Sequence, residues 1–394
     1  MTPPHRWFVL SIFVLSTTIN FLDRQTLATV APLLRAELHL SNAEYGWIVA
    51  SFSITYAICS PFAGLLMDRI GLQRGIVLAV ALWSMAALST GWVRGFSGLL
   101  VCRAMLGVAE AGGIPAAAKA IQHYLLPAER ALGNSVNQAG VSLGLIVAPP
   151  LATWFAVQYN WRTAFLATGI LGLLWIPLWR FVGRDSIPQA DLKSATVTRS
   201  QTLLRDKRLW IFALANALSM IPYALWTNWT TLHLVDVNNL SLVRSAWFAS
   251  LPPLFAALGG LAGGALSFRA MRTGAPAIAA RTRVCLLAAI VCLITAAIPW
   301  APSAVWAAAG ISVSFFAVAA FSVNMYSMPL DVFSPGRVGF AVSLLTCSYG
   351  VMQAVTSPLV GAVVDRYSYT PVCLVASVMP LLAVTILKRT ESLR

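Results

Sequence analysis

Charged residues are scarce in this 394-residue chain, because Asp, Glu, Lys and Arg together make up only 10% of it. A typical soluble domain contains about 25% charged residues. Hydrophobic residues reach 58%, and the mean hydropathy is +0.76. A water-soluble protein of this size could not bury so many apolar side chains in its core, whereas a lipid bilayer accommodates them on the protein surface. The composition therefore excludes an ordinary soluble protein and predicts a membrane protein.

Several motifs that carry chemistry in other proteins are missing. The sequence has no His-rich metal cluster, no nucleophile elbow and no Gly-rich phosphate loop, so it gives no support for a membrane enzyme or sensor. None of the six cysteines forms a C-x-x-C pair, and free thiols packed like small hydrophobic side chains are expected. We expect no enzymatic activity, no metal and no cofactor other than protons as a coupling ion.

Twelve apolar segments are each long enough to span a bilayer, which takes about 20 residues. The first has no A-x-A-like cleavage site and is expected to be retained as a helix. Residues 183–207 form a long polar stretch that divides the segments six and six. We predict an all-α membrane protein with two pseudo-symmetric six-helix bundles, residues 1–182 and 208–394, joined by a cytoplasmic linker at 183–207. The segments are 7–33, 44–66, 75–93, 97–124, 130–156, 163–182, 208–233, 244–268, 282–300, 303–330, 337–363 and 370–388.

The formal net charge of +14 is also typical of proteins that bind nucleic acid, so its location matters. With an even number of helices and the N-terminus inside, most of the 27 Lys and Arg fall in loops on the cytoplasmic side. The positive-inside rule explains this bias without DNA or RNA. We therefore expect a multi-pass protein of the inner membrane, monomeric and surrounded by lipid, with both termini in the cytoplasm.

Four charged residues lie inside predicted spans: Asp23, Arg24, Arg103 and Glu110. A charge at membrane depth costs a few kcal/mol or more, so it is normally present for function. Arginines suit an anionic ligand because the planar guanidinium binds a carboxylate through two hydrogen bonds, whereas carboxylates suit protons. The pattern predicts a proton-coupled transporter of an organic anion.

The spacing of these residues predicts how they face. Arg103 and Glu110 are seven residues apart, so they share a helix face about 10 Å apart, and Gly107 between them is expected to leave room for a cavity. Asp23 and Arg24 point about 100° apart and should serve different partners. We predict that Arg24 and Arg103 bind the anion and Glu110 exchanges protons. A structural ion pair with an arginine is the alternative for Glu110.

The turn after the second segment reads G-x-x-x-D-R-x-G-x-x-R, a pattern that resembles the signature loop of the major facilitator superfamily. The resemblance implies a cytoplasmic gate that latches the outward-open state, with an ordinary solvated turn as the alternative. The matching place in the second half has Phe268 instead of the acid, so a one-sided latch is expected. The gate residues are Gly64, Asp68, Arg69, Gly71 and Arg74.

A narrower resemblance runs through most of residues 8–180. It is carried by I-N-F-L-D-R-Q-T-L at 19–27, N-A-E-Y-G at 42–46 and R-x-x-L-G-x-x-E-A at 103–111. These motifs resemble the anion:cation symporter family and its hexuronate-transporter-like members. The resemblance implies uptake of a hexuronate or related sugar acid by proton-coupled symport and alternating access. It also implies that Asp23 is a second protonatable acid, for which helix capping or packing is the alternative.

Polar and aromatic residues in the other spans are weaker candidates for substrate contacts. Tyr56 and Trp226 have alternative interpretations, as a packing residue and as part of an interfacial aromatic belt. His233, near a helix end, is expected to be interfacial. The full set of weaker candidates is Tyr56, Asn137, Gln138, Trp226, Asn228, Asn324 and Thr346.

Two other transport functions use similar features. A phosphate-driven antiporter of an organophosphate would also need two arginines but no titrating carboxylates, so a pH-gradient test separates it from the symporter. A multidrug exporter of this superfamily usually has G-x-x-x-G-P-x-x-G-G in its fifth helix. Here that helix reads G-V-S-L-G-L-I-V-A-P from Gly140 onward, so the pattern is absent.

Overall fold

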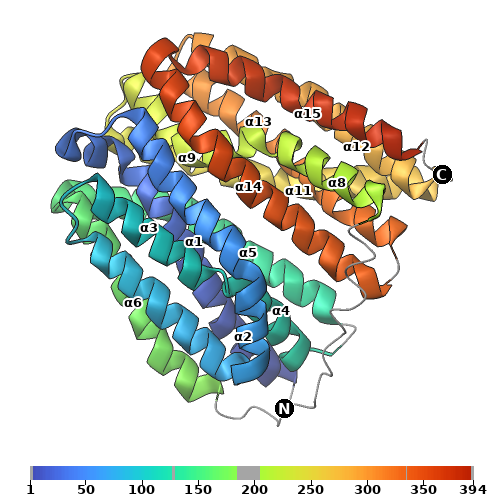
Figure 1. Ribbon diagram of the computed structural model, residues 1–394, viewed down its shortest axis with the longest axis horizontal. Helices are drawn as coiled ribbons and strands as arrows, with labels where there is room; N and C mark the ends of the chain where they lie inside the picture. The colour runs from blue at the N-terminus through green and yellow to red at the C-terminus, as the bar shows by residue number, and fades with distance from the viewer. Residues whose placement is uncertain (1–2, 127–128, 184–204, 334, 392–394) are drawn as a thin grey trace. The chain divides into compact units, whose positions relative to one another are not determined.

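The computed structural model describes residues 3–126, 129–183, 205–333 and 335–391 (Figure 1). Within these residues the regular secondary structure is entirely helical, as the composition predicted. In the part of the chain that the structure describes, eleven helices are long and apolar enough to cross a membrane, and they overlap with eleven of the predicted segments. The remaining segment, 44–66, lies in the first part of a longer helix. Most of the predicted linker, residues 184–204, lies outside the described residues.

The chain divides into two compact units. Unit 1 comprises Met1–Ala190 with Ser241–Ser250, and unit 2 comprises Asp191–Leu240 with Leu251–Arg394. The predicted bundle boundaries at 182 and 208 remain a prediction. The helices of unit 1 are α1 (Pro3–Leu38), α2 (Asn42–Thr90), α3 (Phe96–Glu110), α4 (Gly113–Tyr124), α5 (Arg130–Gln158), α6 (Trp161–Val182) and α10 (Leu242–Ala249).

Helix α2 contains two predicted spans, and it changes direction between them at Gly71. Gly71 has φ 79° and ψ 161°, a conformation outside the helical region that glycine reaches without a steric penalty. The first arm of α2, residues 42–70, begins at a capping box: the Ser41 hydroxyl accepts from Glu44 N, and Glu44 Oε2 accepts from Ser41 N at 2.8 Å. The sequence-predicted turn is therefore a sharp bend that keeps both arms helical.

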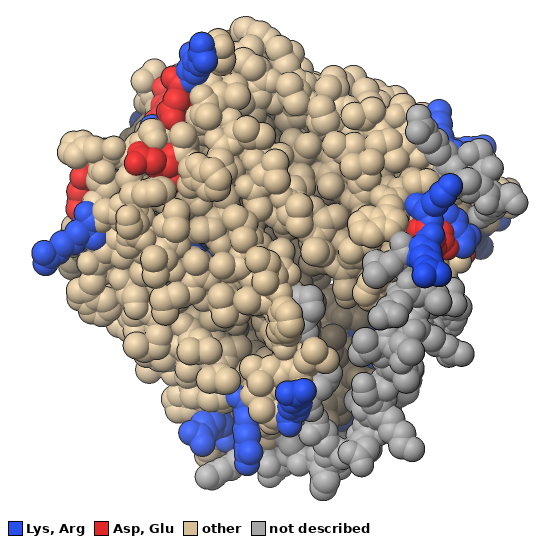
Figure 2. Space-filling view, in the orientation of Figure 1, with Lys and Arg blue, Asp and Glu red and all other residues tan. Residues whose placement is uncertain are grey.

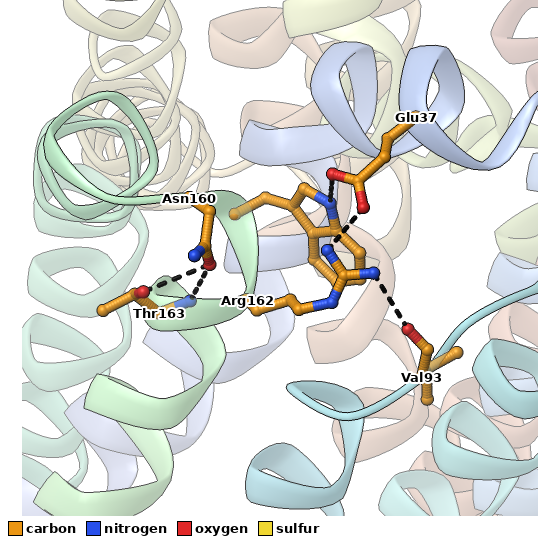
Figure 3. Close-up of polar contacts among 6 residues, drawn as sticks. Glu37, Val93, Asn160, Arg162 and Thr163 are labelled. Atoms are coloured by element: carbon orange, nitrogen blue, oxygen red, sulfur yellow. Dashed lines mark hydrogen bonds and ion pairs between the residues drawn. The ribbon is translucent and has the colours of Figure 1, made fainter.

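The ends of three helices are tied together at one end of unit 1 (Figure 3). Glu37, near the end of α1, accepts a hydrogen bond from Trp161 Nε1 at 2.8 Å and from Arg162 Nη1 at 2.5 Å. Arg162 also donates to the carbonyl of Val93 at 3.2 Å, just after α2. Asn160 caps α6 by accepting from Thr163 N. These contacts join the end of α1, the helix that carries Asp23 and Arg24, to the start of α6.

Unit 2 contains α8 (Lys207–Ser219), α9 (Ile221–Asp236), α11 (Leu251–Arg272), α12 (Ala277–Cys292), η4 (Leu293–Trp300), α13 (Ala304–Val332), α14 (Pro335–Tyr367) and α15 (Tyr369–Glu391). Helices α8 and α9 fill one predicted span and are separated at Met220, because Pro222 in the first turn of α9 lacks the amide hydrogen that a continuous helix needs. Helices α11 and α13 approach closely where Gly259 and Gly263 face the backbone of Phe316 and Ala320.

The surface is that of a protein embedded in lipid. Figure 2 shows a face that is mostly uncharged, with Lys, Arg, Asp and Glu gathered towards its margins. Large apolar side chains are well exposed on both units, for example Phe62 at 66%, Phe181 at 80% and Leu261 at 73%. Exposed apolar surface of this extent needs a lipid partner, which agrees with the predicted membrane location.

Candidate anion-binding site

The site is built from the middle of α1 and from α3, both in unit 1. Arg24 on α1 donates from Nε to Glu110 Oε2 on α3 at 2.5 Å. The Glu110 side chain is fully buried, whereas the Arg24 side chain is 23% exposed. The two charges that the sequence placed on different helices therefore meet as an ion pair, and of the two side chains only that of the arginine is partly exposed.

Asp23 and Arg24 point in different directions, as their helical spacing predicted. Asp23 is only 1% exposed, and among the described residues neither of its carboxylate oxygens has a hydrogen-bond partner. The hydroxyl of Thr168 lies beside Asp23 and donates to the carbonyl of Phe165 at 3.2 Å. A buried carboxylate without partners is costly in its charged form. The role of Asp23 as a second protonatable acid remains a prediction.

Arg103 does not share the setting of Arg24. It is 3% exposed, and its Cζ lies 5.4 Å from the ring centroid of Phe165 on α6. It is within electrostatic range of Glu110 and Asp23, and its Nε has no partner among the described residues. The prediction that both arginines bind the anion remains a prediction, but only Arg24 is partly exposed.

Three aromatic rings surround the Arg24 guanidinium. Its Cζ lies 4.7 Å from the ring centroid of Tyr56, 4.9 Å from that of Phe21 and 5.0 Å from that of Phe52. Tyr56 was a predicted site residue, whereas the sequence analysis missed the two phenylalanines. The signal for them was helical spacing, since Phe21 lies three residues before Arg24 and Phe52 four before Tyr56.

Gly107 has a different role from the one predicted. A Cβ at this position would clash with Thr55 Oγ1 and the carbonyl of Phe52, and would lie 3.1 Å from Tyr56 N. Gly107 therefore makes no space for a solute. It allows α3 to pack directly against the first arm of α2, where Thr55 Oγ1 also donates to the carbonyl of Ala104 at 2.9 Å.

We expect Gly107→Ala to destabilise unit 1, because the added methyl group meets backbone atoms that cannot move aside. Overpacking of this kind costs about 1–3 kcal/mol. The apparent melting temperature of the detergent-purified protein should fall. Gly113→Ala is the matched control, since a Cβ there has no atom within 4 Å. Equal melting temperatures for the two variants would contradict the close α2–α3 contact.

The gate motif is only partly described. Gly71 makes the bend in α2, and a Cβ at Gly64 would lie 3.9 Å from Pro115 Cγ on α4. Arg69 and Arg74 are exposed. The side chain of Asp68 lies outside the described residues, so the latch remains a prediction.

Besides Tyr56, unit 1 contains two weaker candidates, of which one makes a structural contact and the other is exposed. Asn137 on α5 accepts a hydrogen bond from Thr17 on α1 through Oδ1 at 2.9 Å, which ties two helices together. Gln138, its neighbour, is exposed.

The weaker candidates of unit 2 make contacts within that unit. Asn324 is fully buried and donates to the carbonyls of Gly263 and Ala320, so it joins α13 to α11. Asn228 donates to Ala224 in its own helix, and Thr346 donates to Val342 in its own helix at 3.3 Å.

Trp226 and His233 are both buried within unit 2, with 1% and 0% of the residue exposed. The predicted substrate contact of Trp226 and the predicted interfacial position of His233 remain predictions. The His233 ring packs edge-on against Trp226 at 5.4 Å and Tyr369 at 4.8 Å between centroids. Sequence position near a helix end says nothing about the direction in which a side chain points, and here both point inward.

Comparison of the sequence with known proteins identifies the family of this chain. A sequence model of the Major Facilitator Superfamily matches residues 13–329. The hexuronate transporter of Escherichia coli (strain K12) is 29% identical over 401 residues, covering 97% of this chain and 93% of that protein. The galacturonate transporter of Dickeya chrysanthemi is 30% identical over 279 residues, covering 66% of this chain and 80% of that protein.

A solved structure shows the same fold. It is a bacterial homologue of the human lysosomal transporter Spinster in an inward-facing and occupied conformation, which matches with a TM-score of 0.83 at 19% identity. The match covers 100% of this chain and 98% of that one, and at this identity it shows the fold alone. Because the family match spans most of the sequence, the chain belongs to the Major Facilitator Superfamily and is a multi-pass membrane transporter, not an enzyme.

Proposed function

We propose that this transporter takes up a hexuronate or related sugar acid by proton-coupled symport and alternating access. The printed functions of its relatives, a hexuronate transporter and a galacturonate transporter, support the substrate class. The ion pair between part-exposed Arg24 and fully buried Glu110 is the single observation that carries the proposal. It brings together a cation that fits a carboxylate and an acid that can release that cation by taking up a proton.

The proposed cycle begins with the pair closed. Protonation of Glu110 removes the charge that holds Arg24, and the guanidinium can then bind the carboxylate of the substrate through two hydrogen bonds. Asp23 takes a second proton, and Arg103 supplies a second positive charge within unit 1. After the transporter has changed from the outward-open to the inward-open state, loss of the protons restores the ion pair and displaces the anion. Protons are the coupling ion in this proposal, which involves no bound cofactor.

The orientation in the proposal follows the sequence analysis. The protein lies in the inner membrane with both termini in the cytoplasm, and a single chain is the transporting unit. Uptake then draws on the proton gradient, because protons and substrate move inward together.

Uptake by proteoliposomes tests the proposed function. Radiolabelled galacturonate or glucuronate should accumulate above its outside concentration when the outside is more acidic than the lumen, and a protonophore should abolish the accumulation. Protein-free liposomes are the control. Exchange of an organophosphate against internal phosphate, with no response to the pH gradient, would contradict the symport proposal and favour the antiporter.

A further inference from the structure

The rings around Arg24 come from two helices. Phe21 belongs to α1, as does Arg24, whereas Phe52 and Tyr56 belong to the first arm of α2. Phe52 and Tyr56 stack on each other with centroids 5.7 Å apart and planes at 24°. Cations within about 6 Å of a ring centroid are attracted by the ring quadrupole, and all three rings meet that distance. We call these three residues the Arg24 cage.

The cage is held in a fixed relation to Glu110. Gly107 on α3 lies directly against the backbone of Phe52 and Tyr56, and the Thr55 hydroxyl donates to the carbonyl of Ala104 on the same helix. Glu110 lies one helical turn after Gly107 on α3. The helix that carries the partner carboxylate and the helix that carries two of the rings therefore pack as one body around Arg24.

The proposed cycle breaks the Arg24–Glu110 pair, and this creates a difficulty that the cage solves. An arginine side chain without its counter-ion has many rotamers available, and it also lacks compensation for its charge in a low-dielectric setting. Aromatic faces keep attracting the guanidinium when Glu110 is neutral, because the ring quadrupole does not depend on proton uptake.

We propose that the Arg24 cage holds the guanidinium in its anion-binding position while Glu110 is protonated, and that Phe52 is a positioning residue for the substrate carboxylate. This inference rests on the proposed function of Arg24. It assigns the phenyl ring at 52 an electrostatic role in substrate affinity that a purely apolar packing residue would not have.

A fluorination series at position 52 tests the proposal. Phenylalanines with one, two and three ring fluorines have nearly the same size but progressively weaker quadrupoles. We expect the KM for galacturonate uptake to rise stepwise, by about threefold to tenfold across the series, with little change in maximal rate. The same series at Phe13 is the matched control and should leave KM unchanged. Phe13 lies on α1 about three turns before Arg24 and is buried against Trp179.

Natural substitutions give a second measurement. Phe52→Leu keeps apolar volume but removes the ring, so it should raise KM. Phe52→Tyr keeps an aromatic ring, so its KM should stay near the wild-type value. A KM that stays flat across the fluorination series would overturn the cage proposal, even if Phe52→Leu were poorly folded. If that flat result came with loss of uptake in Arg24→Ala, the proposed function would stand without the cage. Unchanged uptake in Arg24→Ala would overturn both proposals.

Discussion

Arg24→Ala is expected to abolish concentrative uptake of the sugar acid, lowering the initial rate by at least about 100-fold. The substitution removes the one part-exposed cation of the buried cluster and leaves Glu110 without its ion-pair partner. Losing one member of a buried pair costs about 3–5 kcal/mol, because the remaining charge is uncompensated. The measurement is initial uptake by proteoliposomes under an inward proton gradient.

Two further variants separate lost binding from lost folding. Arg24→Ala combined with Glu110→Gln removes both charges, so it should regain the thermal stability that the single variant loses, yet remain inactive. Arg24→Lys keeps the charge but not the planar fork, so it should transport weakly with a much higher KM. Arg94→Ala, at an exposed position of unit 1, is the control and should transport normally. Normal uptake by Arg24→Ala would remove the basis of the site.

The helices were predictable because hydropathy reports directly on the need for apolar length across a bilayer. The breaks within the apolar segments were harder to predict. The polar loop motif around Gly71 predicts a turn, whereas Pro222 lies within an apolar run and predicts no more than a possible kink in a continuous span. The structure shows that Pro222 starts a new helix after Met220. An apolar segment can contain such a break without any change in composition.

The charged residues of the site were predictable because a charge in an apolar helix stands out against its surroundings. The directions in which their side chains point could not be predicted from the sequence. Spacing placed Arg103 and Glu110 on one face, but it gave no means of knowing that Arg103 packs against Phe165 while Arg24 takes the carboxylate. Packing against a third helix decides which arginine is accessible, and that contact joins residues far apart in the chain.

The aromatic residues were the least predictable part of the site. Helical spacing placed Phe21 near Arg24 and Phe52 near Tyr56, but phenylalanine is common on lipid-facing helix surfaces, so the spacing alone did not separate these two residues from lipid-facing ones. Trp226 has two sequence-based interpretations, a substrate contact and an interfacial belt residue, and the structure adds a third setting by burying it against His233. Aromatic residues occur in cores, in belts and around cations, and only neighbouring side chains distinguish these settings.

Glu110→Gln is expected to abolish proton-driven accumulation while leaving exchange of labelled for unlabelled substrate. Glutamine has the shape of a protonated glutamate and can still contact Arg24, but it neither binds nor releases a proton. The guanidinium is then permanently free to bind the anion. Wild-type uptake should rise as the outside becomes more acidic, because protonation of Glu110 favours anion binding. The variant should show a flat response over the same pH range.

Counterflow and gradient-driven uptake, measured on the same proteoliposomes, distinguish uncoupling from inactivity. A variant that merely misfolds loses both, whereas an uncoupled one keeps counterflow near the wild-type rate. Glu129→Gln is the control. Glu129 pairs with Arg6 at 3.4 Å and is not part of the Arg24–Glu110 site, so uptake by this variant should remain coupled to protons. Full pH-driven accumulation by Glu110→Gln would show that its carboxyl group does not carry the coupled proton. Asp23 on α1, the other buried acid among the described residues, would then be the group to replace by asparagine.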